Sequence, residues 1–435
     1  MGPNRRQFLG FGASGVIGAA IPLSAPAARP ELLKTKASIV IIGAGAAGTS
    51  LANRLVNRLK GAQISIIDPS AEHWYQPGLS LVAAGLKPAN YVVSETSQWL
   101  PAQASLISER AVEIDPEANA VTTDTGRKLR YDYLVVAPGL VLDHNAIEGF
   151  SLDLVGSNGI GALYAGPAYA ERTWHAASTF VEQGGVGLFT RPATEMKCAG
   201  APLKHTFLID DIARRGGSSG KHEIIYANHS KSLFGVPIVA EKVRMLFEER
   251  GISPVLSHVL EGIDPGRKIA RFTTSSGTQE IDYDYLHVIP PQRAPDFVRQ
   301  SGLSWADKWV DQGWVEVDPH SLRHRRYPNV FAAGDVAGIP KGKTAASVKW
   351  QVPVVEDHLV AAIDDREGTT SYNGYTSCPM ITRLGRAMLI EFDYQNNLVP
   401  SFPGMIAPLE ELWITWLMKT LALKPTYNAM LRGEA

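Results

Sequence analysis

Cysteine is almost absent from this chain of 435 residues, which contains only Cys198 and Cys378. Two thiols are too few for a small fold held together by several disulfides. They also exclude any iron–sulfur or zinc site that needs four thiolates. No pair of histidines has the H-x-x-H spacing, and no histidine stands in an H-x-E motif, so the sequence predicts no metal site. The 42 basic and 43 acidic residues leave a formal net charge of −1, which excludes the electrostatic footprint of a nucleic-acid-binding protein.

Long apolar runs are also lacking, and the composition is that of an ordinary globular chain. With 45% hydrophobic and 20% charged residues, the sequence is neither that of a disordered chain nor that of a polytopic membrane protein. At roughly 150 residues per domain, the length predicts about three domains.

Residues 1–27 have the pattern of an export signal. The pair Arg5-Arg6 precedes an apolar, glycine-rich stretch, Phe8–Leu23, which ends at the small residues Ala25–Ala27. We interpret this as a twin-arginine signal peptide. A membrane anchor is disfavoured because the apolar run is short and interrupted by three glycines. We therefore expect export by the twin-arginine route to the periplasmic face of the cytoplasmic membrane.

The segment after this signal has the pattern of a dinucleotide-binding unit. A β-branched strand, a glycine turn, a helix and a second strand follow one another, and an acidic residue ends the second strand. Such a turn lets a pyrophosphate approach the backbone and the helix N-terminus, while the acid accepts hydrogen bonds from ribose. The elements are Ser38–Ile42, the glycines Gly43, Gly45 and Gly48, the helix Thr49–Lys60, the strand Gln63–Ile67 and Asp68.

Two later segments indicate that the dinucleotide is FAD. Tyr131–Gly139 predicts a buried strand that ends in Ala137-Pro138-Gly139, and Tyr327–Asp335 predicts another that ends in Gly334-Asp335. Asp335 is suited to bind the ribityl chain of a flavin, and the segment from Lys343 can open a helix aimed at the ring system. With these motifs the chain resembles the flavoproteins that contain two dinucleotide-binding domains.

The second half of that pattern is incomplete. Asp282–Pro291 echoes Tyr131–Gly139, which predicts a second, related α/β unit. After its strand, Gly187–Thr190, an NADH-dependent relative would carry another glycine fingerprint, but no G-x-G-x-x-G occurs in residues 151–310. Cys198 follows instead, so the nicotinamide site is predicted to be lost.

The two cysteines have two readings from the residues alone. They are either structural, as an inert disulfide in an exported protein or as two buried thiols, or they are a redox pair beside the flavin. Lys197 and Lys204 near Cys198 favour a thiolate, which makes Lys204 a candidate catalytic residue. Glycine and proline neighbours predict exposed turns rather than strand interiors around Cys198 and Cys378.

At this point the chain resembles the sulfide:quinone oxidoreductases. The resemblance implies that hydrogen sulfide is oxidised to zero-valent sulfur on a Cys198–Cys378 pair, and that FAD passes two electrons to a membrane quinone. It also assigns the three glycines of the first turn, Asp68 and Asp335 to FAD and Lys343 to the vicinity of the flavin. Pro138, Gly139 and Gly334, in the two strand-end motifs, are further candidates for FAD binding. The matching stretches are Trp74–Pro77, Lys197–Pro202, Leu286–Pro291, His324–Phe331, Gly374–Pro379 and Glu391–Tyr394.

Departures from the family refine this expectation. Residues 139–197 contain no third cysteine, so the chain resembles the branch that includes the mitochondrial enzyme and hands its sulfur to a small thiol or sulfite. No cysteine lies near Gln76–Leu81, so FAD is expected to be noncovalent. Pro138 stands where the family usually has threonine. The final sulfur product, the choice of ubiquinone or menaquinone, and homo-oligomer formation stay open.

The C-terminal region has the pattern of an amphipathic helix. Leu409, Leu412, Trp413, Trp416, Leu417 and Leu421 recur at helical spacing among charged residues. We expect this helix to lie at a membrane surface. The resemblance implies a peripheral, monotopic protein that docks by this region on the periplasmic face of the membrane. The alternative is a helix packed on its own domain or in a dimer interface. A quinone pocket is expected to be lined by Phe402, Met380 and Ile381, with Lys419 near its mouth.

Taken together, the sequence predicts an α/β fold with two Rossmann-like, glutathione-reductase-like domains and a C-terminal membrane-docking region. The FAD domain comprises residues 36–150 and 312–370, the second Rossmann-like domain residues 151–311, and the quinone and membrane region residues 371–435. The principal alternative is a flavoprotein sulfide dehydrogenase that donates electrons to a cytochrome c. The C-terminal helix and the missing flavin-linking cysteine argue against it.

Overall fold

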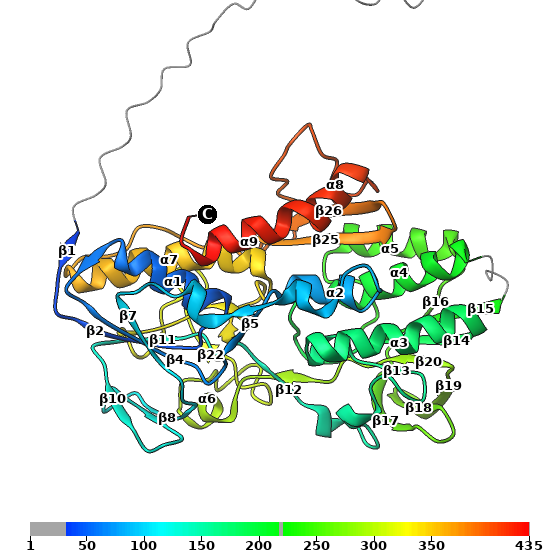
Figure 1. Cartoon of the computed structure of the whole chain (residues 1–435), viewed down its shortest axis with the longest axis horizontal. Coiled ribbons are helices and arrows are strands. Elements are labelled where there is room, and N and C mark those ends of the chain that lie inside the picture. The colour runs from blue at the N-terminus through cyan, green and yellow to red at the C-terminus, as the bar shows by residue number, and fades with distance from the viewer. Residues whose placement is uncertain (1–31, 217–220, 435) are drawn as a thin grey trace, which may run out of the picture. The chain divides into compact units, whose positions relative to one another are not determined.

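The computed structural model describes residues 32–216 and 221–434, so the predicted export signal, residues 1–27, lies outside the described residues. Two five-stranded parallel sheets form the framework of this part of the chain (Figure 1). The first has the order β23 (Val330–Ala332), β11 (Tyr133–Val136), β2 (Ser38–Ile42), β4 (Gln63–Ile67) and β7 (Ala104–Ile107). The second has the order β13 (Ile160–Gly161), β20 (Tyr285–His287), β14 (Gly185–Arg191), β15 (His222–Asn228) and β16 (Ser253–Leu256).

The predicted strand–turn–helix–strand unit is present, with one shift in its helix. Strands β2 and β4 have the predicted bounds, but α1 is Ala46–Val56 rather than Thr49–Lys60. The helix starts directly after the glycine turn, so Gly48 lies in its first turn, where a Cβ atom would come 1.9 Å from the Gly43 carbonyl oxygen. It also ends earlier, since Leu59–Lys60 forms the short strand β3.

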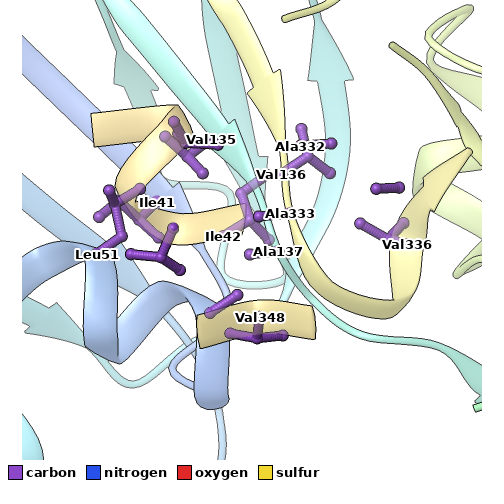
Figure 2. Close-up of a cluster of buried hydrophobic side chains, with 14 of the residues drawn as sticks. Ile41, Ile42, Leu51, Val135, Val136, Ala137, Ala332, Ala333, Val336 and Val348 are labelled. Carbon is purple, nitrogen blue, oxygen red and sulfur yellow. The ribbon is translucent and has the colours of Figure 1, made fainter. Parts of the chain in front are cut away.

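Apolar side chains hold this first sheet against its helices. Figure 2 shows the side chains at the carboxyl ends of β2, β11 and β23 gathered around Leu51 of α1 and Val348 of α7 (Ala345–Ile363). Strand β2 is buried at four of its five positions. Continuous apolar burial of this kind is typical of a parallel strand that is covered on both faces. The packing therefore places the glycine turn and the start of α7 at the same edge of the sheet.

The second unit repeats the architecture of the first. A three-stranded antiparallel sheet, β8 (Ala111–Asp115), β9 (Ala120–Thr123) and β10 (Lys128–Arg130), precedes β11. A second one, β17 (Val259–Asp264), β18 (Ile269–Thr274) and β19 (Gly277–Asp282), precedes β20 in the same way. The expected echo of Tyr131–Gly139 in Asp282–Pro291 is thus confirmed. Where the chain passes between the units, β12 (Val141–Leu142) pairs antiparallel with β21 (Gln292–Arg293) (Figure 1).

A hairpin and a broken helix follow α7. The hairpin consists of β25 (Thr376–Arg383) and β26 (Arg386–Phe392). The predicted C-terminal helix begins only at Trp413 and contains a π-turn, so it runs as α8 (Trp413–Leu417), the π-turn Met418–Ala422 and α9 (Leu423–Leu431). Leu409 and Leu412 precede it. Among residues 32–216 and 221–434, no helix has the length and apolarity to cross a membrane.

The remaining elements are shorter connections and the helices of the second unit. The helices are α2 (Leu79–Val82), α3 (Pro167–Gln183), α4 (Ala201–Arg215), α5 (Pro237–Glu249) and α6 (Asp296–Gln300). The strands are β1 (Leu33–Lys34), β5 (Glu72–Trp74), β6 (Val93–Glu95), β22 (Val315–Glu316) and β24 (Ala337–Gly338).

Candidate active site

The glycine turn between β2 and α1 forms an open cradle. Gly43 has a φ of +101°, and a Cβ atom there would lie 2.3 Å from the Ala137 carbonyl oxygen, so the turn accepts no side chain. Gly45 faces open space instead, with no atom within 4 Å of its Cβ position. No side chain caps the N-terminus of α1. The free N–H groups and the open space at Gly45 are what a pyrophosphate requires.

Three further predicted residues surround this cradle. The Asp68 carboxylate accepts a hydrogen bond of 2.6 Å from the Ala44 N–H, so it lies beside the glycine turn. Gly139, after the half-buried Pro138, has a φ of +72° and open space at its Cβ position. Gly334, with a φ of +76°, donates its N–H to the Gln351 side chain at 2.8 Å. The structure thus brings four loops to one edge of the first sheet.

The start of α7 extends this edge. Thr344 is the N-cap and accepts a hydrogen bond from the Ser347 N–H, as the predicted helix start requires. Lys343 is turned inward: its ammonium donates to the carbonyls of Asp335 at 2.5 Å and Ala337 at 3.1 Å. It also lies 3.8 Å from the centroid of the Trp314 ring. Burial lowers the pKa of Lys343 to about 8.

Asp335 provides a direct test of whether these residues fit a flavin nucleotide. Its carboxylate is half-buried, and it accepts no hydrogen bond from the described residues. Burial raises its pKa, while Lys197 and Lys343 act in the opposite direction. A carboxylate so placed lacks a donor such as a ribityl hydroxyl would supply. With the cradle at Gly45 and the open space at Gly139, the site fits FAD.

Cys198 lies in the turn that connects β14 to α4. This turn comprises residues 192–200, whereas the turn between β2 and α1 comprises only residues 43–45. The longer turn contains no second glycine fingerprint. Cys198 is half-buried and has a φ of +46°, a left-handed conformation that is strained for a residue with a side chain. Its N–H donates to the Lys343 carbonyl at 2.8 Å, which connects it to the start of α7.

Cys378 corrects one prediction. It lies inside strand β25 and is only 3% exposed, not in an exposed turn as its neighbours suggested. Pro379 is tolerated because β25 pairs only with β26, which leaves its other edge free of ladder hydrogen bonds. Strand β25 packs against α4, and a Cβ atom on Gly200 would come 2.5 Å from the Cys378 sulfur. The absence of a side chain at Gly200 therefore makes room for this sulfur beside Cys198.

The two cysteines titrate as one pair, and their pKa values are shifted in opposite directions. A hydrogen bond from Cys378 is the largest cause that holds the pKa of Cys198 well below its usual range, and Lys204 and Lys419 act in the same direction. The pKa of Cys378 is raised well above its usual value by its hydrogen bond with Cys198 and by burial. In the reduced pair, Cys198 is therefore the thiolate and Cys378 the thiol.

Two buried ammonium groups balance that thiolate. Lys204, on α4, is 3% exposed and places its Nζ atom 3.3 Å from the Cys198 sulfur. Burial opposes the charge of Lys204, but the two sulfurs raise its pKa above the usual value. Lys419 is 2% exposed and donates to the Pro77 carbonyl at 2.6 Å. Burial and the charge of Lys204 lower the pKa of Lys419 to about 7, against the opposing effect of both sulfurs.

Lys419 shows what sequence reasoning missed. The lysine was expected at the mouth of a quinone pocket, but it is buried and interacts electrostatically with both cysteines. It sits in the π-turn Met418–Ala422, and such turns are frequent at functional sites. Nothing in the local sequence announces a π-turn, so no pattern could have found this placement.

The other three residues expected around a quinone are dispersed. Met380 and Ile381 are fully buried, point to opposite sides of β25 and belong to two different hydrophobic clusters. Phe402 lies in the loop after β26 and is 39% exposed. No group of three or more metal-ligating side chains occurs within residues 32–216 and 221–434.

Sequence comparison supplies the context for this geometry. Residues 37–162 match the family model of the pyridine nucleotide-disulphide oxidoreductases. The mitochondrial sulfide:quinone oxidoreductase of Mus musculus is 35% identical over 408 residues, which cover 92% of this chain and 87% of that protein. The mitochondrial sulfide:quinone oxidoreductase of Dictyostelium discoideum is 33% identical, with coverages of 92% and 87%.

Structure comparison supports the same fold. The crystal structure of the sulfide:quinone oxidoreductase from Aquifex aeolicus aligns with a TM-score of 0.77. That alignment covers 91% of this chain and 92% of the Aquifex chain at 21% sequence identity. The parallel sheets described above are therefore those of an α/β flavoprotein fold.

Proposed function

This chain belongs to the sulfide:quinone oxidoreductases, and we propose that Cys198 and Cys378 are the redox pair through which it oxidises hydrogen sulfide and reduces a quinone. The family is that of FAD-dependent oxidoreductases. The observation that carries the assignment of the pair is the meeting of two cysteines that lie far apart in the sequence, beside the Lys204 ammonium and at the edge of the first sheet.

The opposite pKa shifts of the two cysteines suggest which role each sulfur has in the reaction. A hydrosulfide ion attacks the sulfur of Cys378 in the oxidised pair, so that the S–S bond breaks and Cys198 leaves as a thiolate. Cys378 then carries the added sulfur as a persulfide, and Lys204 compensates the charge on Cys198. A small thiolate or sulfite takes the outer sulfur, which returns Cys378 to a thiol.

The cradle at the first sheet is proposed to hold FAD, with Gly43, Gly45 and Gly48 at the pyrophosphate, Asp68 at a ribose, and Pro138, Gly139, Gly334 and Asp335 around the flavin end. Bound FAD would supply the acceptor for the two electrons released when the Cys198–Cys378 bond re-forms, and would provide their route to the quinone. Lys343 holds the Asp335 and Ala337 carbonyls and thereby orients the turn that carries the Asp335 side chain.

The C-terminal region is proposed to dock on a membrane and to admit the quinone. Five large apolar side chains in this region are exposed: Phe402, Met405, Trp413, Ile414 and Leu421. Tryptophan and leucine at the ends of a short helical segment suit the headgroup region of a bilayer. The quinone site expected near Phe402, Met380, Ile381 and Lys419 stays part of this proposal. Because Met380 and Ile381 point to opposite sides of β25, only one of these two side chains can face the quinone. Export by the twin-arginine pattern in residues 1–27 is also proposed.

An anaerobic titration of the purified protein tests the redox assignment. We expect hydrosulfide to bleach the flavin absorbance, a short-chain ubiquinone to restore it, and NADH to leave it unchanged. Cys198→Ser and Cys378→Ser should each lower the rate of bleaching by at least about 100-fold, because removal of one member of a catalytic unit abolishes the action of the whole. Thermal unfolding of both variants checks that they still fold.

The opposite results have distinct meanings. Bleaching by hydrosulfide that survives in both serine variants contradicts the cysteine mechanism. Restoration of the absorbance by a cytochrome c but not by the quinone would favour sulfide dehydrogenase activity instead.

A further inference from the structure

The peptide unit that joins Lys197 to Cys198 is held at both of its polar ends. Its N–H, which belongs to Cys198, donates to the Lys343 carbonyl at 2.8 Å. Its carbonyl, which belongs to Lys197, accepts a hydrogen bond from the Tyr164 hydroxyl at 2.9 Å. Among the side chains of the described residues, the one that donates a hydrogen bond to this carbonyl is that of Tyr164.

Tyr164 is well placed to act as such an anchor. It lies in the short 3-10 turn Leu163–Ala165, ahead of α3, and is 6% exposed. Its hydroxyl also lies 3.1 Å from the Cys198 carbonyl, so one proton is shared between two successive carbonyls. Burial and then the nearby sulfurs of Cys198 and Cys378 raise the pKa of Tyr164 well above its usual value, so the hydroxyl stays a donor.

The anchored peptide is the one whose rotation would relax Cys198. A flip of the Lys197–Cys198 peptide changes φ of Cys198 by about half a turn and carries it from the left-handed into the extended region, which a cysteine adopts without strain. The flip would exchange the positions of the N–H and the carbonyl, and both would lose their partners. Hydrogen bonds at the two ends therefore maintain a conformation that the cysteine would not adopt by itself.

We propose that Tyr164 is a positioning residue that keeps the Cys198 sulfur against Lys204 and Cys378 by locking the Lys197–Cys198 peptide. The proposal rests on the redox role proposed for Cys198. It adds a residue from a different part of the chain that touches neither the sulfide nor the quinone. Without the Tyr164 hydroxyl, only the Lys343 carbonyl would hold this peptide. Cys198 could then leave its left-handed conformation, and its sulfur could leave its place beside the Lys204 ammonium.

The test is Tyr164→Phe, which keeps the ring and removes only the hydroxyl. In the FAD-loaded protein we expect the turnover number with sulfide to fall about 10- to 100-fold, the usual consequence of a misplaced reacting group, with the KM for the quinone unchanged. The matched control is Tyr285→Phe, which removes another buried hydroxyl of the same unit, bonded at 2.6 Å to His205. This control is expected to retain turnover.

A second readout follows the thiol itself and needs no turnover. We measure the alkylation rate of Cys198 by iodoacetamide against pH in the reduced protein, by mass spectrometry. Displacement from the Lys204 ammonium should move the midpoint to higher pH by about one unit in Tyr164→Phe. The charged and titratable groups that act on or respond to Cys198 are Lys204 on α4, Lys419 in the π-turn, Cys378 on β25, Lys197 in the turn, Asp335 after β23, and Tyr164.

The outcomes separate this proposal from the one on which it rests. An unchanged alkylation midpoint and turnover in Tyr164→Phe overturn the positioning role, whatever the serine variants show. A shifted midpoint together with turnover that survives loss of both cysteines supports the anchor and overturns the redox pair. Should Tyr164→Phe not fold, residue-resolved hydrogen exchange of the wild-type protein decides. Slow exchange at the Cys198 amide supports the lock, and exchange at the rate of an open turn contradicts it.

Discussion

At the scale of single residues, the charge on Cys198 depends on three neighbouring side chains. The Lys204 ammonium is 3.3 Å from the sulfur and buried with it, so little water screens their interaction. The Cys378 thiol contributes a hydrogen bond, and Lys419 adds a second positive charge from the C-terminal region. A thiolate at neutral pH is thus a property of these three groups together and not of Cys198 alone.

Lys204→Met tests this dependence through pH. Because the ammonium lowers the pKa of Cys198, its loss raises that pKa, and the thiolate then forms only at higher pH. We expect the acidic limb of the plot of sulfide turnover against pH to move to higher pH, with a rate at pH 7 lower by about 10-fold.

The matched control is Lys231→Met, an exposed lysine in the turn before α5. It removes a charge of the same sign and should leave the pH profile in place. A Lys204→Met profile that coincides with the wild type contradicts the role given to this ammonium.

At the scale of elements, the site depends on where helices begin and how they are interrupted. The N-cap of helix α7 is Thr344, directly after the lysine whose carbonyl accepts the Cys198 N–H. The π-turn between α8 and α9 carries the buried Lys419. The start of α7 was predictable, because lysine, threonine and serine after a glycine–aspartate strand end are typical of a capped helix. The π-turn was not, because packing of the C-terminal helix decides it.

The cap of α7 yields a prediction about stability. Thr344→Ala removes the side chain that accepts from the Ser347 N–H and should lower the free energy of unfolding by about 1 kcal/mol. Because the same turn holds Cys198, sulfide turnover should fall as well. Scanning calorimetry and the sulfide assay measure the two effects.

Thr426→Ala is the comparison for this experiment. That hydroxyl lies on α9 and bonds the Ala422 carbonyl within its own helix. It should change neither the unfolding temperature appreciably nor the turnover. Equal effects of the two substitutions would mean that the cap has no special connection to the site.

At the scale of the whole molecule, exposed large apolar side chains occur at several places in the described residues, and they are most concentrated in the C-terminal region. The residues after Phe402 include several large apolar side chains with more than a third of their surface exposed. Apolar side chains gathered in one segment typically mark an interaction surface. The unit of a parallel sheet with an antiparallel insert occurs twice and positions the cysteines. This repeated architecture does not by itself predict a membrane contact.

The double variant Trp413→Ser, Leu421→Ser tests the proposed membrane contact. Trp413 is 57% exposed and Leu421 is 61% exposed, so neither change disturbs the core. We expect co-sedimentation with phospholipid vesicles to fall by about 10-fold, because the apolar area available for insertion is reduced. Sulfide oxidation with a short-chain quinone in detergent should persist.

Val310→Ser is the control for loss of an exposed apolar side chain, since Val310 is 59% exposed in a different part of the chain. It should sediment like the wild type. Vesicle binding that is unaffected by the double variant contradicts docking through this region.

Several features of this protein were determined by the sequence alone. The glycine turn, the strands Ser38–Ile42 and Gln63–Ile67, the lost second fingerprint and the helix start at Thr344 are local, because each depends on backbone geometry and neighbours a few residues away. Cys198 and Lys204 could be paired from the sequence because they lie within one turn and the helix that follows it.

Only the tertiary structure decided the rest of the site. Cys378 reaches Cys198 because β25 packs against α4, and its proline neighbour concealed a strand. Lys419 reaches the pair through a π-turn, and Tyr164 through a turn ahead of α3. These contacts join residues from distant parts of the chain, and they form only when the two sheets, the hairpin and the C-terminal helix pack together. No local pattern encodes such contacts, because their energy comes from burial shared among all of these elements.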